Sequence, residues 1–258
     1  TRPGLPLPPG EPAINPVPRA MIRAALAEIG IAAAEVTISV EHGEKLAERT
    51  LNGRLGIVGG LSILGTTGIV VPYSCAAWIA SIHQGINVAR AAGIAHVAGA
   101  TGSGSEAAVR ALHGLSDLAL IDMGDFVGGM LKHLRAHPVP RVSIAGGVAK
   151  MTKLAQGLLD LHSKRGEVSL AVLAALAKDA GADTHLVAAI AAANTAKHAF
   201  ELAAGLSLGN VVAARAWQTA ADVLDDAPIE LEILLFDRAG NLAGRAPFAP
   251  VHARNRLR

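Results

Sequence analysis

Residues 94–122 read IAHVAGATGSGSEAAVRALHGLSDLALID, and this stretch decides the fold. A short apolar run at 94–98 leads into a glycine-rich loop at 99–104, and a helix-compatible segment then leads to a second apolar run at 118–121. Short apolar runs joined by helices are typical of parallel strands in βαβ units. We therefore predict an α/β fold with a mainly parallel sheet and flanking helices, in which ligands bind at the carboxyl ends of the strands.

Two more apolar runs extend this pattern along the chain. The run at 55–58 precedes a glycine-rich loop at 59–68, and the run at 142–145 precedes Gly146-Gly147. Because the carboxyl ends of parallel strands meet at one edge of a sheet, we expect all of these loops on that edge.

The flanking regions have a different character. Residues 169–223 are rich in alanine and carry almost no β pattern, so we predict an Ala-rich helical region with Ser169 as its first N-cap. Residues 230–236, a turn at 237–241 and a return strand at Leu242 have the signature of a C-terminal β-hairpin. A further strand is expected at 35–40, after a Pro-rich start and a helix.

We expect three parts in the chain. Residues 1–50 form a first part, residues 51–165 form an α/β ligand-binding domain, and residues 166–258 form the helical region and hairpin. The single cysteine, Cys75, excludes an internal disulfide and favours a reducing, cytoplasmic location. We expect Cys75, Trp78 and Trp217 to pack in the core.

Composition excludes several classes of partner. The net charge is only +2, with 3% aromatic residues and no basic–aromatic interleaving, so we expect no nucleic-acid partner. The apolar stretch 55–89 is interrupted by glycines, Pro72 and hydroxyl residues, and it falls short of the roughly 20 continuous apolar residues that a membrane span requires. His133 and His137 have metal-ligand spacing but no third ligand, so we predict no metal site. The sequence leaves open whether the chain forms a homo-oligomer.

The loop at 99–104 is the strongest candidate for a cofactor site. Small residues let backbone amides approach a ligand, a helix N-terminus offers free N–H groups, and the acid Asp122 about 20 residues on could hold a ribose hydroxyl. The glycine spacing departs from G-x-G-x-x-G, and Glu106 would repel a pyrophosphate. A cationic or neutral adenosine-containing cofactor is therefore favoured over a dinucleotide, although tight turns without a ligand would give the same pattern. The predicted cofactor-binding residues are Gly59, Gly60, Thr66, Thr67, Gly99, Thr101, Gly102, Ser103 and Asp122.

Charged residues at the other strand ends are candidates for chemistry and substrate binding. Asp125 follows a predicted strand, where it would take a proton, face a cationic centre or simply cap a helix. Lys150 and Lys153 stand near the start of a helix, where the dipole disfavours cations, so they indicate an anionic partner or a solvated pair. His162 lies in a polar cluster that would extend the same anion site.

Five segments resemble one known family closely. They are 10–19 (GEPAINPVPR), 36–40 (VTISV), 54–70 (RLGIVGGLSILGTTGIV), 124–128 (GDFVG) and Gly146-Gly147-x-x-Lys150. Together they resemble the CbiD family, the cobalt-precorrin-5B C1-methyltransferases of cobalamin biosynthesis. Members of that family carry a further N-terminal region. The resemblance therefore implies that this chain is the C-terminal portion of a two-domain protein and that residues 1–50 are the remainder of an N-terminal α+β domain.

The resemblance implies transfer of a methyl group from S-adenosylmethionine to carbon C1 of a precorrin tetrapyrrole, with or without cobalt. On this reading the glycine-rich loops and Asp122 hold the cofactor, and Asp125 or Glu106 faces the sulfonium or acts as a base. The substrate's many carboxylates would pair with Lys150, Lys153, Arg19 and His162.

Two other functions compete with this one. An NAD(P)-dependent oxidoreductase would use the loop 99–104 and Asp122, although Glu106 weighs against it. A non-catalytic tetrapyrrole-binding module would need only Lys150 and Lys153.

Overall fold

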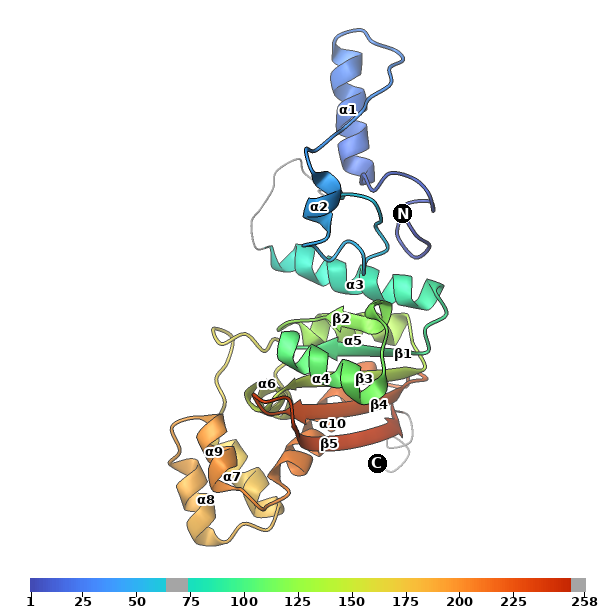
Figure 1. The fold of residues 1–258 in the computed structure, drawn as a ribbon. Helices are drawn as coiled ribbons and strands as arrows, with labels where there is room; N and C mark the ends of the chain where they lie inside the picture. The colour runs from blue at the N-terminus through green and yellow to red at the C-terminus, as the bar shows by residue number, and fades with distance from the viewer. Residues whose placement is uncertain (64–73, 252–258) are drawn as a thin grey trace. The chain divides into compact units, whose positions relative to one another are not determined.

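The computed structural model describes residues 1–63 and 74–251. The chain forms two compact units, Thr1–Gly93 (unit 1) and Ile94–Arg258 (unit 2), and each is considered by itself (Figure 1). The sequence placed the domain boundaries near residues 50 and 165, whereas the contacts divide the chain at Gly93.

Unit 1 consists of helices joined by long irregular segments. Its helices are α1 (Pro16–Glu28), α2 (Gly43–Ala47) and α3 (Cys75–Ala91). The expected helix before Gly30 is confirmed as α1, although it begins at Pro16. A proline in the first turn loses no helical hydrogen bond, and Gly30 ends the segment with a φ of +76°.

Both strands predicted for unit 1 are wrong. Residues 35–40 alternate Val36, Ile38 and Val40, but all three side chains are exposed and the segment has no regular secondary structure. A strand needs a hydrogen-bonding neighbour, and the described part of unit 1 supplies none for this segment. Residues 52–56 form a turn instead, in which Leu55 N–H donates to the carbonyl of Leu51, and residues 57–58 have no regular secondary structure.

The expected core positions of Cys75 and Trp78 are also wrong. Both lie in the first turn of α3 and are exposed, Trp78 by 43%. The buried stripe of this helix begins one turn later, at Ile82 and Ile86. Periodicity alone does not show where along a helix its packing partner begins.

Unit 2 contains a five-stranded, mostly parallel sheet in the order β2-β1-β3-β4-β5, which confirms the predicted fold class. Its strands are β1 (His96–Ala100), β2 (Leu120–Asp122), β3 (Arg141–Gly147), β4 (Glu230–Phe236) and β5 (Leu242–Pro250). The first four are parallel, and β5 returns antiparallel to β4 as the predicted hairpin.

Helices cover both faces of this sheet. Helix α4 (Ser103–His113) buries Val109 against Ala98, Leu234 and Phe236 on one face. Helices α5 (Val127–Ala136) and α10 (Leu208–Leu224) cover the other face, where the Trp217 indole N–H donates to the carbonyl of Leu231 at 2.8 Å. Trp217 is 3% exposed, so its predicted core position is confirmed.

The region between the sheet strands β3 and β4 is helical, as predicted. Helix α6 (Val148–Ala155) follows β3 directly, and α7 (Leu170–Asp179), α8 (Thr184–Ala191) and α9 (Ala196–Leu202) form a separate group beside the sheet (Figure 1). The side chain of Ser169 accepts a hydrogen bond from Val172 N–H at 3.3 Å, which confirms it as an N-cap. No helix in the described ranges combines the length and apolar character needed to cross a bilayer.

Candidate active site

A cavity of about 890 Å³ opens at the carboxyl ends of β1, β3 and β4. Its lining comes from the β1–α4 loop (residues 101–105), the start of α6 (147–150), α9 with the following loop, the start of α10, and the β4–β5 turn (236–239). All of the described residues that line it belong to unit 2. A volume of this size suits a cofactor or another drug-sized ligand.

The sheet topology explains why the cavity forms here. From β1 the chain moves outward to β2 and then crosses back to β3 on the opposite side of β1. Helix α4, which follows β1, lies on one face of the sheet, whereas α6, which follows β3, packs against α10 on the other face. The loops after β1 and β3 therefore diverge, and such a switch point leaves a crevice at the carboxyl ends of the strands.

The β1–α4 loop brings free backbone to the cavity. Gly102 is the N-cap of α4, and no side chain caps the first N–H groups of this helix. A Cβ atom added at Gly102 or Gly104 would meet nothing within 4 Å. Ser105 turns its hydroxyl back to the carbonyl of Gly102 at 2.9 Å. The start of α4 therefore offers N–H donors and open space to a polar ligand.

Strand β3 ends in two glycines with opposite environments. Gly147, the N-cap of α6, also lacks any atom within 4 Å of an added Cβ. At Gly146 such an atom would lie 2.5 Å from Met151 Sδ and 2.9 Å from Thr101 Oγ1. Gly146 thus allows the β1–α4 loop and the start of α6 to pack against the end of β3, and Gly147 leaves the cavity open.

An ion pair joins α6 to the loop after β2. The Lys150 ammonium contacts the Asp125 carboxylate, and both side chains are partly buried. Burial, followed by the like charge of Lys153, holds the pKa of Lys150 below its usual value, while Asp160 raises it. The structure therefore brings together Asp125 and Lys150, two residues that the sequence predicted for different roles.

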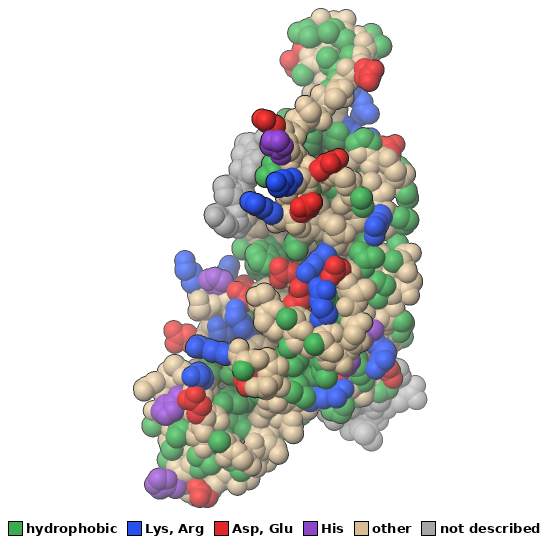
Figure 2. Space-filling view, viewed as in Figure 1, with side chains coloured by type: hydrophobic (Ala, Val, Ile, Leu, Met, Phe, Trp, Pro, Cys, Tyr) green, Lys and Arg blue, Asp and Glu red, His purple; other side chains and the backbone are tan. Residues whose placement is uncertain are grey.

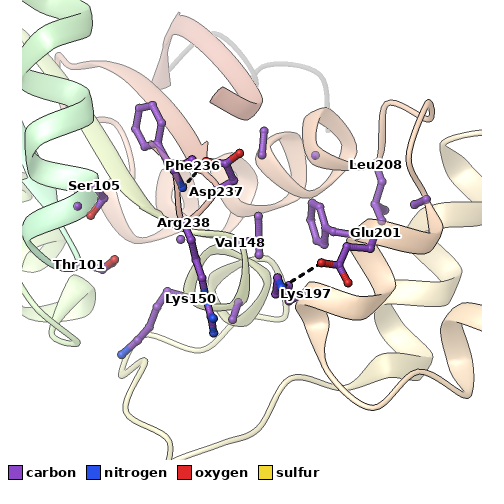
Figure 3. Close-up of a pocket in the computed structure, with 18 of the residues that line it drawn as sticks. Thr101, Ser105, Val148, Lys150, Lys197, Glu201, Leu208, Phe236, Asp237 and Arg238 are labelled. Carbon is purple, nitrogen blue, oxygen red and sulfur yellow. Dashed lines mark hydrogen bonds and ion pairs between the residues drawn. The ribbon is translucent and has the colours of Figure 1, made fainter. Parts of the chain in front are cut away.

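The residues of the third wall of the cavity were not predicted from the sequence. This wall consists of Phe200, Lys197 and Glu201 on α9 and of Phe236 and Arg238 at the end of β4. Figure 3 shows Arg238 extending from the β4–β5 turn toward Lys150 and the start of α6. Lys197 pairs with Glu201 at 3.0 Å. Because β4 is parallel to β3, its carboxyl end reaches the same edge as the predicted loops.

Only some of the predicted cofactor-binding residues of unit 2 line the cavity. Thr101, Gly102 and Ser103 line the cavity. Gly99 does not belong to the loop: it lies inside β1, and an added Cβ would lie 2.3 Å from Met130 Sδ, so it is a packing glycine. Asp122 ends β2 beside Ala100 and lies outside the set of residues that line the cavity.

The described unit 1 candidates, Gly59, Gly60 and Arg19, are not among the residues that line this cavity. Gly59 and Gly60 lie in unit 1, and Thr66 and Thr67 fall outside the described residues. The Arg19 guanidinium binds Glu11 Oε2 at 2.6 Å and the carbonyls of the Pro-rich segment, so it is engaged in holding that segment.

Two of the predicted substrate-binding residues in unit 2 have partners of their own outside the cavity lining. Lys153 is 7% exposed and donates to the carbonyl of Leu161 at 3.1 Å, which makes it a structural lysine. His162 is exposed outside the cavity, where its Nδ1 accepts from Lys164 N–H at 3.1 Å. Glu106 lies half-buried in the first turn of α4.

A second polar cluster lies at the amino end of the strands, opposite the cavity. Glu232 is fully buried and accepts from Ser143 Oγ, from Arg245 and from His113, the last at 2.7 Å. His96 bonds to Ser143 Oγ at 2.9 Å. Burial, followed by the charges of His113 and Arg141, lowers the pKa of His96 to about 4.

Within the described ranges, no group of three His, Cys, Asp or Glu side chains has the arrangement of a metal site. The His133 and His137 rings instead stack at 4.3 Å between centroids.

Comparisons with known proteins agree on one family. A family model described as CbiD matches residues 1–72, and a model described as "CbiD, C-terminal domain" matches residues 160–247. A cobalt-precorrin-5B C(1)-methyltransferase from Agrobacterium fabrum is 63% identical over 256 residues, covering 98% of this chain and 68% of that protein. Another from Bradyrhizobium sp. is 62% identical over 252 residues, covering 95% of this chain and 67% of that protein.

One solved structure also matches. The crystal structure of the cobalamin biosynthesis protein (cbiD) from Archaeoglobus fulgidus is 26% identical and covers 63% of this chain and 54% of that chain. Its TM-score of 0.25 is too low to support any part of the fold.

Proposed function

Because the chain belongs to the CbiD family, we infer that it is a cobalt-precorrin-5B C(1)-methyltransferase of cobalamin biosynthesis that uses S-adenosylmethionine. The reaction forms a bond between C1 of the macrocycle and the methyl carbon, breaks the carbon–sulfur bond and releases S-adenosylhomocysteine. The chain spans 68% of the length of the Agrobacterium fabrum relative. We further propose that the protein is cytoplasmic and that it forms a homo-oligomer.

We propose that the cavity in unit 2 is the site of this reaction. The observation that carries the proposal is the position of the cavity at the switch point, between two helices whose first N–H groups have no side-chain cap. Open space over Gly102, Gly104 and Gly147 leaves room for a ligand against the backbone.

The residues present fit S-adenosylmethionine chemically. The side chains of Phe200 and Phe236 supply aromatic surface for an adenine ring. The start of α4 and the hydroxyls of Thr101 and Ser103 supply hydrogen bonds for ribose or carboxylate oxygens. The bound cofactor supplies a methyl group already activated on a sulfonium, so the protein needs no nucleophile of its own.

The remaining tasks of the protein are alignment and exclusion of water. Val148, Leu208 and Phe236 form an apolar wall that excludes water from the reacting atoms. Asp125, Glu106 and Asp122 are not among the lining residues, but they lie on elements that adjoin the cavity, and the ion pair with Lys150 fixes the Asp125 carboxylate. We propose that a bound ligand reaches these carboxylates, so that Asp125 and Glu106 face the reacting centre and Asp122 contacts the ribose.

Calorimetric titration with S-adenosylhomocysteine tests the site. We expect saturable binding by the wild-type chain and at least about tenfold weaker binding by Asp122→Asn, since a ribose hydroxyl would lose a charged acceptor. Asp226→Asn, which changes an exposed acid outside the cavity, serves as the matched control. Equal affinity of the wild-type chain and a folded Asp122→Asn variant would remove Asp122 from the site.

A further inference from the structure

Three cationic side chains from separate elements line the cavity. Lys150 comes from α6, Lys197 from α9 and Arg238 from the β4–β5 turn (Figure 3). Figure 2 shows Lys and Arg side chains gathered on this face of unit 2, over α6 and α9. The positive charge at the mouth of the cavity therefore arises from the fold and not from a run of sequence.

Only one of these cations lacks an acidic partner among the described residues. Lys150 contacts Asp125, and Lys197 pairs with Glu201 at 3.0 Å. Arg238 is exposed, and no carboxylate of the described chain lies within ion-pair distance of its guanidinium.

The turn that carries Arg238 is held by its neighbour. Asp237 Oδ1 accepts from the N–H groups of Ala239 and Asn241, both at 2.8 Å, and Oδ2 accepts from Asn241 Nδ2 at 3.0 Å. These hydrogen bonds lower the pKa of the Asp237 carboxyl. The carboxylate is thus engaged by its own turn, and the adjacent guanidinium is presented to the cavity on a preorganised loop.

A planar guanidinium without a partner is suited to bind a carboxylate through two parallel hydrogen bonds. We propose that Arg238 binds a side-chain carboxylate of the tetrapyrrole substrate and thereby orients the macrocycle in the cavity. The proposal rests on the function inferred above, and it adds a substrate-binding residue that the sequence did not indicate.

The amino-acid part of the cofactor carries a carboxylate of the same chemistry. Two observations favour the substrate. The uncapped starts of α4 and α6 already offer donors to the carboxylate of the cofactor. Arg238 is exposed, so it meets the part of a ligand that extends toward solvent, as a macrocycle with several carboxylates would.

The test compares Arg238→Ala and Arg238→Lys with the wild-type chain. Arg135→Ala serves as the control, because Arg135 is an exposed arginine outside the cavity, in the last turn of α5. Binding of cobalt-precorrin-5B is followed by visible absorbance, the KM and kcat of methyl transfer are measured at saturating S-adenosylmethionine, and S-adenosylhomocysteine affinity is measured by calorimetry.

We expect the dissociation constant and KM for the tetrapyrrole to rise roughly tenfold in Arg238→Ala. The rise should be smaller in Arg238→Lys, because lysine keeps the positive charge but cannot form two parallel hydrogen bonds to one carboxylate. The kcat should stay within about twofold, and S-adenosylhomocysteine affinity should not change. Added salt should weaken tetrapyrrole binding more in the wild-type chain than in Arg238→Ala, because salt screens the lost charge pair.

Unchanged tetrapyrrole binding in Arg238→Ala would overturn the proposal. Weaker S-adenosylhomocysteine binding with unchanged tetrapyrrole binding would also overturn it, and would assign Arg238 to the cofactor carboxylate. A wild-type chain that binds the tetrapyrrole through Arg238 but transfers no methyl group would support the proposal and contradict the inferred activity. The two claims therefore fail separately.

Discussion

Replacing Gly104 with leucine should block the cavity without unfolding the protein. Gly104 is the second residue of α4 and lines the cavity, and an added Cβ there meets nothing within 4 Å. The new side chain therefore enters open space and not the core. Folding and ligand binding are expected to respond in opposite directions.

The magnitudes follow from this geometry. Leucine is favoured over glycine inside a helix by about 0.7 kcal/mol, and the gain is smaller in the first turn, so the melting temperature should stay equal or rise by about 2 °C. Forcing a ligand against the added side chain should weaken its binding by about 1–3 kcal/mol, which corresponds to roughly 5- to 150-fold in affinity.

The assay combines thermal denaturation with calorimetric titration of S-adenosylhomocysteine. Ala107→Leu adds the same side chain to an exposed position of the same helix outside the cavity, and it should change neither quantity appreciably. Unchanged affinity in a stably folded Gly104→Leu variant would refute the assignment of the cavity as the cofactor site.

Three further predictions concern stability. Gly146→Ala should destabilise the protein by about 1–3 kcal/mol in urea denaturation, because the new methyl group meets Met151 and Thr101 at the distances given above. Wild-type stability would show that the β1–α4 loop and α6 can move apart freely. The pKa of His96 is lowered to about 4, so protonation favours the unfolded state and stability should fall as the pH drops from about 6.5 to 4. For a fully buried ring this loss of stability would be about 3 kcal/mol, and solvent screening of the half-buried ring reduces it to roughly 1 kcal/mol. Between pH 7 and pH 4, the His96→Asn variant should therefore lose roughly 1 kcal/mol less stability than the wild-type protein. Equal losses in the two proteins would contradict the lowered pKa of His96. Trp217→Phe should lose about 1–2 kcal/mol in the same assay by leaving the Leu231 carbonyl without its indole donor, and a variant as stable as wild type would show that another donor replaces it.

Strands β1 to β4 of unit 2 were predictable because each contains a short apolar run with a clear boundary, whereas β5 was predicted only from the turn at 237–241. In unit 1 the same kind of evidence failed. Val36, Ile38 and Val40 alternate as they would in a half-buried strand. A strand forms only when it hydrogen-bonds to a neighbouring strand, and the local sequence does not show which segment that neighbour is. Register and strand order depend on contacts between distant residues, which no local pattern contains.

The site was partly predictable for the same reason. The glycines and hydroxyl residues at the carboxyl ends of β1 and β3 predicted two of the segments that line the cavity. Lys197 and Arg238 look like ordinary residues of a surface helix and a turn, and only the parallel pairing of β4 with β3 brings the turn to the cavity. Conversely, Lys153 and Gly99 were predicted as ligand contacts. In the structure the buried Lys153 ammonium donates to the carbonyl of Leu161, and Gly99 makes room for the side chain of Met130.

The most direct test of the central claim is amide hydrogen exchange with and without S-adenosylhomocysteine. The first N–H groups of α4 and α6 have no side-chain cap, so they should exchange quickly in the free protein. We predict that the ligand slows exchange in residues 101–106 and 147–151. Protection confined to Thr1–Gly93, or no protection at saturating ligand, would contradict the assignment of the cofactor site to this cavity.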